Sequence, residues 1–257
     1  GCRPPTRRRH RPDLFLLDSA TALVERLRGQ TGHLLHCGSI WRCGPSVKVP
    51  ITEDDPTPPL GEYGIEKAAI ARMLKQETGS GGLVTTSLHP GHIVGPGWHP
   101  IGPLGNVDAT VWHKLSAGQP IDVPGIGAEF MHHVHADDVA QAFEAAVVRR
   151  DAAAGQDFYV VAPSALNVRG YARTAASWFG QTADLRCVTW DEFRRTTDDD
   201  AAQTSWDHLV RNHCFSIDKA RTLLGYAPRF EPEDAVLESV RWLVDHDRLD
   251  VANPLTN

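Results

Sequence analysis

Short apolar runs alternate with amphipathic segments along the first part of the chain. Runs over 14–17, 33–37 and 83–88 have the length and composition of buried strands in a parallel sheet. Between them, apolar positions recur at helical spacing over 19–29, where Ser19 is the expected N-cap, and over 63–77. This alternation predicts an α/β fold in which crossover helices connect parallel strands.

The second half of the sequence favours helices over strands. Strands are predicted over 119–123 and 157–161. The predicted helices cover, in chain order, 107–118, 136–149, 167–180, 204–213, 216–224 and 233–247. The charge run Asp198-Asp199-Asp200 is expected to be a solvated loop.

Residues 1–12 differ from the rest of the chain. They are rich in Arg and Pro and contain almost no core-forming residue, so we expect a disordered basic tail. A tail that binds an acidic partner is the alternative. The whole chain has a formal charge of -6, which argues against a nucleic-acid binder.

The overall composition is that of a globular protein, with 41% hydrophobic and 23% charged residues. No apolar run approaches the roughly 20 residues that cross a bilayer, and none resembles a secretory signal. The five cysteines are scattered and never form a CxxC pair. We therefore expect reduced thiols in a cytoplasmic protein that does not act at a membrane.

Tyr63 and Lys67 form the most informative pair of polar residues. Four residues apart, they share one face of the predicted helix. An ammonium one turn away is expected to lower the pKa of the phenol, which would make Tyr63 a usable general acid or base. Ser39 follows a predicted strand, from where its hydroxyl can hydrogen-bond a substrate oxygen. The alternative for the bare spacing is an exposed tyrosine beside a solvated lysine.

A dense group of potential metal ligands lies at the start of another predicted helix. It comprises His132, His133, His135, Asp137 and Asp138. Their spacing does not match HExxH or a common zinc arrangement, so we expect no metal. The loop over 97–103 is either a substrate-side loop or a rigid surface turn.

Five segments in order resemble one known family. They are His36-Cys37-Gly38-Ser39-Ile40-Trp41, Glu62 to Lys67, His89 to Gly97, Val134 to Ala140, and Lys219 to Tyr226. Together they cover the chain from about residue 13 to its end. The sequence resembles the extended short-chain dehydrogenase/reductase superfamily, in its NAD-dependent epimerase/dehydratase branch.

The resemblance implies a role for each matching residue. Tyr63 would transfer the proton, Lys67 would tune it and bind the nicotinamide ribose, and Ser39 would orient the substrate oxygen. Pro90, Gly91, His92 and Ile93 would line the nicotinamide pocket. The family often forms homodimers.

The same resemblance implies a Rossmann-like, doubly wound parallel sheet. We expect a partial NAD(P)-binding domain over 13–165. A mainly helical C-terminal substrate lobe would cover 166–257, with parts of 98–135 contributing.

One family feature is missing from the sequence. The family's first strand leads into a Gly-x-x-Gly-x-x-Gly turn that receives the cofactor pyrophosphate, and no such motif precedes Tyr63. Residues 13–17 resemble the family's fourth strand instead. We therefore expect an N-terminally truncated sheet with an unpaired edge, and impaired binding of NAD or NADP.

Two hypotheses follow for the function. The first is an NAD(P)-dependent oxidoreductase or epimerase acting on a hydroxyl or carbonyl group of a small molecule or sugar derivative. The second is a catalytically inactive fragment, or a cofactor-free protein that binds a small molecule. Ile40 and Trp41 stand where dehydratases usually have an acidic pair, which counts against dehydration.

Overall fold

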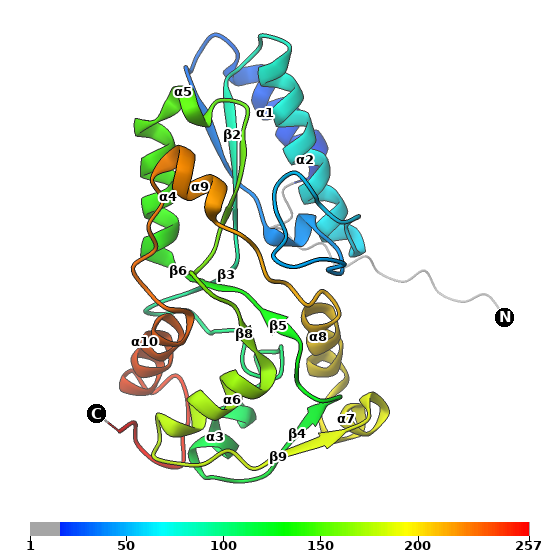
Figure 1. Ribbon diagram of the computed structural model, residues 1–257, viewed down its shortest axis with the longest axis vertical. Coiled ribbons are helices and arrows are strands. Elements are labelled where there is room, and N and C mark those ends of the chain that lie inside the picture. The colour runs from blue at the N-terminus through cyan, green and yellow to red at the C-terminus, as the bar shows by residue number, and fades with distance from the viewer. Residues whose placement is uncertain (1–15, 257) are drawn as a thin grey trace, which may run out of the picture.

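A parallel sheet of three strands forms the centre of the upper part of the molecule (Figure 1). The computed structural model describes residues 16–256. Strands β1 (Leu34–Cys37), β2 (Thr85–Pro90) and β7 (Asp157–Val160) lie in the order β1-β2-β7, all parallel. Every residue of the central strand β2 is buried. The α/β fold with a parallel sheet is thereby confirmed.

Helices cover both faces of this sheet. On one face α2 (Gly61–Gly79) packs on β2, and α1 (Leu17–Leu27) packs on α2. On the other lie α4 (Ala136–Val148), α5 (Arg150–Ala153) and α9 (Asp218–Leu224) (Figure 1). The apolar stripe of each helix is therefore buried against the sheet or a neighbouring helix.

The first described helix begins earlier than expected. Leu17, predicted to end a strand, is the first residue of α1, and Leu16 stands at the N-cap in place of the predicted Ser19. The carboxylate of Glu66 on α2 accepts the backbone N–H of Leu17 at 2.9 Å. Because this partner satisfies one of the free amides of the first turn, the helix needs no side-chain cap of its own. The predicted tail over 1–12 and the predicted strand residues 14 and 15 lie outside the described residues.

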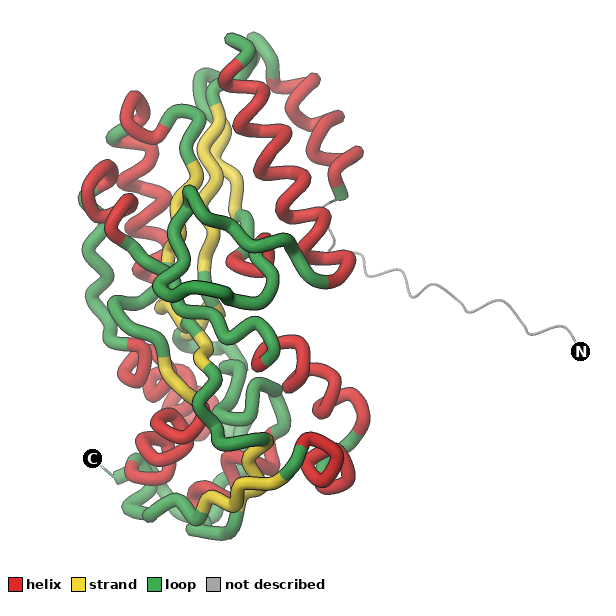
Figure 2. The backbone as a smooth tube through the Cα atoms, turned by 45° about the vertical axis from the view of Figure 1, so that its right-hand side comes forward, coloured by secondary structure: helices red, strands yellow, loops and turns green. Residues whose placement is uncertain are grey.

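Short strand pairs continue downward from the sheet (Figure 2). Strand β3 (His92–Val94) pairs in parallel with β6 (His133–His135). Strand β5 (Phe130–Met131) pairs antiparallel with β8 (Leu166–Asn167), and β4 (Ile121–Pro124) pairs in parallel with β9 (Leu185–Val188). These pairs lead the chain from the sheet to a second hydrophobic core.

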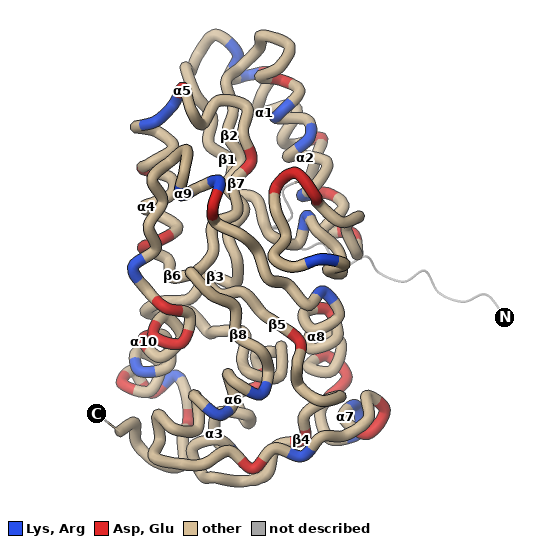
Figure 3. Tube along the Cα trace, viewed as in Figure 1, with Lys and Arg blue, Asp and Glu red and all other residues tan. Residues whose placement is uncertain are grey.

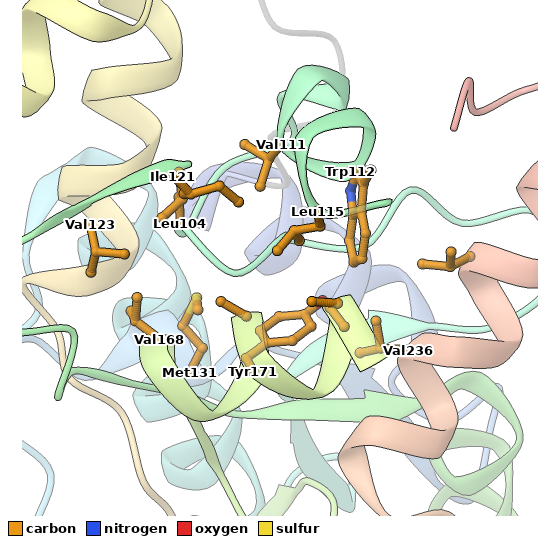
Figure 4. Packing of buried hydrophobic residues seen from close by; sticks show 14 of the residues in the cluster. Leu104, Val111, Trp112, Leu115, Ile121, Val123, Met131, Val168, Tyr171 and Val236 are labelled. Carbon is orange, nitrogen blue, oxygen red and sulfur yellow. The ribbon is translucent and has the colours of Figure 1, made fainter. Parts of the chain in front are cut away.

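That second core lies between helices at the lower end of the molecule. Its helices are α3 (Ala109–Ser116), α6 (Val168–Ser177), α7 (Trp190–Thr196), α8 (Asp199–Leu209) and α10 (Pro232–Asp245). Figure 4 shows Val111 and Leu115 of α3 facing Val168 and Tyr171 of α6. All four side chains are buried, which accounts for the apolar spacing of both segments.

The C-terminal region contributes to both cores. After residue 214 the chain returns to the sheet, where Ile51 and Phe215 form a parallel bridge and α9 packs on β7. The hydroxyl of Tyr226 then donates to the carbonyl of Val161 at 3.1 Å. From there the chain descends again into α10. The domain boundary at residue 165 stays a prediction.

The charge run at 198–200 is a helix start and not a loop, so that prediction was wrong. The carboxylate of Asp198 accepts the backbone N–H of Ala201 at 2.8 Å and caps α8. Asp199 and Asp200 occupy the first turn, where the helix dipole favours negative charge. Helix α8 consequently starts five residues before the predicted 204 and ends at Leu209.

The sequence also predicted that no segment crosses a membrane and that the thiols are reduced. Between residues 16 and 256, no helix is long and apolar enough to span a membrane. In the same range Cys37, Cys43, Cys187 and Cys214 are all free thiols.

Candidate active site

A cavity of about 390 Å³ opens at the carboxyl ends of β1 and β2. It is lined by Ser39, Ile40, Trp41, Tyr63, Gly91, His92, Ile93, Trp98, His99, Ile101 and His208. Open α/β sheets generally bind ligands at this end of their strands. The structure therefore places five of the predicted site residues around one cavity.

Ser39 is held at the end of β1 by the turn that follows it. Its backbone is extended, and its hydroxyl accepts the N–H of Trp41 at 3.1 Å, which caps the short 3-10 helix η1 (Ile40–Arg42). The same hydroxyl lies close enough to the phenol of Tyr63 to lower its pKa. Two hydroxyl groups from segments 24 residues apart thus meet at the cavity wall.

The helix that carries Tyr63 approaches η1 closely at Gly64. A Cβ atom at this position would lie 2.4 Å from the carbonyl oxygen of Trp41, closer than real Cβ atoms come. The rings of Trp41 and Tyr63 then meet edge to face, with centroids 5.9 Å apart. Gly64 therefore permits the approach that brings Tyr63 to Ser39.

Replacing Gly64 by Ala is expected to lower the free energy of unfolding by about 1–3 kcal/mol, because backbone must move to admit the methyl group. Gly79→Ala is the matched control on the same helix, since a Cβ there meets nothing within 4 Å. The control should leave stability unchanged or raise it by about 0.4–1 kcal/mol. Urea unfolding of both variants measures the difference. Equal changes in the free energy of unfolding would show that the close approach of Gly64 to Trp41 does not contribute to stability.

The pKa of Tyr63 lies above its ordinary value, contrary to the predicted lowering by Lys67. Burial is the largest cause, since it disfavours the phenolate, and the nearby Ser39 hydroxyl acts in the opposite direction. Lys67 places its Nζ 5.5 Å from the centroid of the Tyr63 ring, and burial also lowers the pKa of this ammonium. Tyr63 is consequently a neutral phenol near neutral pH, and its raised pKa makes it a weaker proton donor than the sequence predicted.

The second wall of the cavity follows β2. Gly91 donates its N–H to the carbonyl of Val160 at 3.0 Å, and a Cβ there would lie 2.3 Å from the carbonyl oxygen of His132. This close contact holds Gly91, His92 and Ile93 against the cavity. Pro90 ends β2 in the buried interior, and neither it nor Lys67 lines the cavity.

The far wall comes from α8, which sequence reasoning did not connect with the site. His208 packs edge to face on Trp41, with ring centroids 4.9 Å apart. Behind it the buried guanidinium of Arg211 stacks 3.8 Å from the centroid of the Trp41 ring and donates to the carbonyl of Leu60 at 2.7 Å. Leu60 is the N-cap residue of α2, so Arg211 connects the end of α8 to η1 and α2.

Trp98, His99 and Ile101 complete the cavity from the loop over 97–103. The loop thus lies at the same cavity as Ser39 and Tyr63, and its predicted role on the substrate side stays a prediction. The carbonyl of Ile101 is fixed by the hydroxyl of Tyr171 at 3.1 Å and by Nε2 of His133 at 3.0 Å.

A buried ionic network lies beneath the turn at Ser39. Nε2 of His89 lies 3.0 Å from Oδ1 of Asp157, and Arg42 of η1 lies 3.4 Å from the same oxygen. Burial tends to raise the pKa of Asp157, but His89 and Arg42 outweigh it, so the pKa lies below its ordinary value. The paired charges anchor η1, and with it Ser39, to the sheet.

The histidine-rich segment after β5 makes internal hydrogen bonds. Nε2 of His132 bonds the carbonyl of Ala162 at 3.0 Å, and Nδ1 of His135 accepts the N–H of Asp137 at 3.1 Å. The carboxylate of Asp138 accepts the backbone N–H of Arg229. Within residues 16–256, no group of three or more His, Cys, Asp or Glu side chains is arranged to hold a metal ion.

Two curated relatives share part of the sequence. The 2'-dehydrokanamycin reductase of Streptomyces kanamyceticus is 30% identical over 145 residues, which is 56% of this chain and 40% of that protein. The chloroplast stem-loop binding protein of 41 kDa b of Arabidopsis thaliana is 26% identical over 208 residues, 80% of this chain and 50% of that protein. The chain thus spans half or less of the length of these relatives.

Solved structures with low sequence identity share the fold. A UDP-glucuronic acid 4-epimerase from Bacillus cereus, in complex with UDP-glucuronic acid and NAD, has a TM-score of 0.69 at 14% identity and is matched over 67% of its chain. A UDP-glucose 4-epimerase from Thermotoga maritima with UDP-glucose has a TM-score of 0.67 at 19% identity, over 69% of its chain. These matches cover 90% and 89% of the present chain. A family match over residues 16–162, more than half of the sequence, shows that the chain belongs to the NAD dependent epimerase/dehydratase family.

Proposed function

We propose that the protein is an NAD(P)-dependent oxidoreductase or epimerase that acts on a hydroxyl or carbonyl group of a small molecule or sugar derivative. The observation that carries the proposal is the meeting of the Ser39 and Tyr63 hydroxyls at one cavity. The relative named as a reductase and the fold shared with UDP-sugar epimerases support the same reaction class.

Proton transfer at Tyr63 is the chain's own part of this chemistry. In the reducing direction the phenol gives its proton to the substrate oxygen, and in the oxidising direction the phenolate takes it back. When bound, the nicotinamide supplies or accepts the hydride at the substrate carbon. The Ser39 hydroxyl, fixed by Trp41, holds the reacting oxygen next to Tyr63.

The described residues fit the nicotinamide end of such a cofactor better than its pyrophosphate. Gly91, His92 and Ile93 would line the nicotinamide, and Lys67, close behind Tyr63, would hydrogen-bond its ribose. The sequence offers no Gly-x-x-Gly-x-x-Gly turn for the pyrophosphate. We therefore propose that this chain by itself binds NAD or NADP weakly.

Calorimetry with NADH and NADPH tests the proposal. We expect weak binding to this chain and tight binding to an N-terminally extended version that supplies a glycine-rich turn. The extended version should also oxidise the reduced cofactor when given a ketosugar. Tight binding by the present chain would disprove the account of the pyrophosphate site.

The missing glycine-rich turn also favours a second function, a cofactor-free protein that binds a small molecule. In that case the cavity should bind sugar-like ligands while no version of the chain turns over NADH or NADPH. Both functions therefore predict that the cavity binds a sugar-like ligand, but only the first predicts turnover of NADH or NADPH.

A further inference from the structure

We propose that the cavity beside Ser39 and Tyr63 selects an uncharged, ring-shaped substrate and discriminates against ligands that carry a carboxylate, phosphate or ammonium group. This inference rests on the proposed function, because it names the substrate class for the same site. It differs from what the fold alone suggests, since the solved structures of similar fold hold UDP-sugars.

The lining of the cavity is aromatic and carries no charged residue type. Three rings come from Trp41, Tyr63 and Trp98, and three imidazoles from His92, His99 and His208. None of the lining residues is Lys, Arg, Asp or Glu. Figure 3 likewise shows no Lys, Arg, Asp or Glu on β3, which lines the cavity, or on its partner strand β6. The apolar faces of a sugar or aromatic ring can stack on such rings without any ionic partner.

Two of the imidazoles are held in the uncharged form. The pKa of His92 lies well below its ordinary value, because burial disfavours the imidazolium and the neighbouring His208 acts in the same direction. Burial also lowers the pKa of His208. Both ring nitrogens of His92 are buried and without a hydrogen-bond partner among the described residues. Neither His92 nor His208 therefore places a charge on the lining of the cavity.

Two cations lie behind the lining and not in it. The guanidinium of Arg211 covers one face of Trp41, and the ammonium of Lys67 lies over the ring of Tyr63. Arg211 is buried and donates to backbone carbonyls, so it cannot reach a ligand. These cations repel a substrate ammonium. They attract an anion from behind the rings, but the lining has no charged hydrogen-bond donor that could replace the hydration which the anion loses in the cavity.

A matched pair of probes tests the inference. We would measure binding of para-nitrophenyl β-glucoside and para-nitrophenyl β-glucuronide to the full chain by calorimetry, without any dinucleotide. The two probes share both rings and differ in one carboxylate. We expect the glucoside to bind at least tenfold more tightly, because the glucuronide must bury an unpaired carboxylate.

Substitutions at exposed tryptophans locate the binding site. Trp98 lines the cavity and is 51% exposed, so Trp98→Ala should fold normally and bind the glucoside at least fivefold more weakly. Trp206 on α8 is 45% exposed and does not line the cavity, so Trp206→Ala should leave the affinity unchanged. Trp98→Arg places a cation at the rim and should raise the affinity for the glucuronide relative to the glucoside.

Each outcome decides for or against the inference. Equal affinities, a preference for the glucuronide, or no binding of the glucoside would overturn it, and so would an equal loss in the Trp98→Ala and Trp206→Ala variants. Because the measurement needs no cofactor, a failure of the proposed redox function leaves it unaffected. Conversely, NADH-dependent turnover of a charged substrate would reject the inference and retain the proposed function.

Discussion

Lowering the pH from neutral to about 5 is expected to unfold the protein cooperatively. Four histidines, His89, His132, His133 and His213, are buried, and burial is the main cause of their lowered pKa values. The pKa is lowered to about 4 for the first three and to about 3 for His213. The ordinary pKa of a histidine is 6.5. Between about pH 4 and pH 6.5 the unfolded chain therefore binds more protons than the folded chain.

The sign of the effect follows from this difference in bound protons. The stability is fully present above about pH 6.5 and is lost as the pH falls toward the folded-state pKa values. Each histidine contributes a slope of about 1.4 kcal/mol per pH unit, so four contribute roughly 5 kcal/mol per unit. Between about pH 6.5 and pH 5 the four together remove roughly 7–8 kcal/mol, which is comparable with the roughly 5–15 kcal/mol that stabilises a domain.

Urea unfolding followed by circular dichroism at several pH values measures this slope. His213→Gln should reduce the proton uptake on unfolding by about one, because it removes one of the four buried imidazoles. A free energy of unfolding that stays constant between pH 7 and about 5 would contradict the buried neutral histidines.

Tyr63→Phe is expected to reduce turnover by about 10²- to 10⁴-fold, because it removes the group that transfers the proton. The phenyl ring keeps the edge-to-face contact with Trp41, so the fold and the substrate affinity should be nearly unchanged. Steady-state oxidation of NADPH, in the form of the protein that binds the dinucleotide, measures the loss. The change should appear in kcat and hardly in KM.

Tyr226→Phe is the matched control for this measurement. The hydroxyl of Tyr226 donates to the carbonyl of Val161 in the sheet core, away from the cavity. Its removal should cost about 1 kcal/mol of stability and leave kcat unchanged. Full turnover in Tyr63→Phe, or an equal loss in both variants, would exclude Tyr63 as the proton donor.

The pattern of apolar and polar residues predicted the helices and strands whose own sequences show a clear periodicity. The apolar run ending at Leu88 is the fully buried strand β2, and the periodic segment after Tyr63 is α2. Helix α7 was missed although its capping box of Thr189 and Glu192 is a readable signal. The two-residue strands β5 and β8 have no pattern of their own and exist only because tertiary packing brings them together.

The sequence predicted those site residues that directly follow a strand or lie one helical turn from another candidate residue. Ser39, Tyr63 and His92 do so, and the structure places all three at the cavity. His208 and Arg211 lie more than 140 residues beyond Tyr63, and no spacing rule connects them with it. The pKa of Tyr63 was mispredicted because pattern reasoning sees Lys67 but cannot see the burial that outweighs it.

The return of the chain to the sheet after residue 214 constrains how the protein can fold during synthesis. Strand β7 is complete at residue 160, but α9 and Tyr226, which cover it, are made later. The part of its apolar face that they cover therefore stays exposed to chaperones and other nascent chains until this later segment has left the ribosome. Helix α10 follows, and its Ser239 hydrogen-bonds Gly95, so the contacts of the lower core are also completed only after residue 239 has been made.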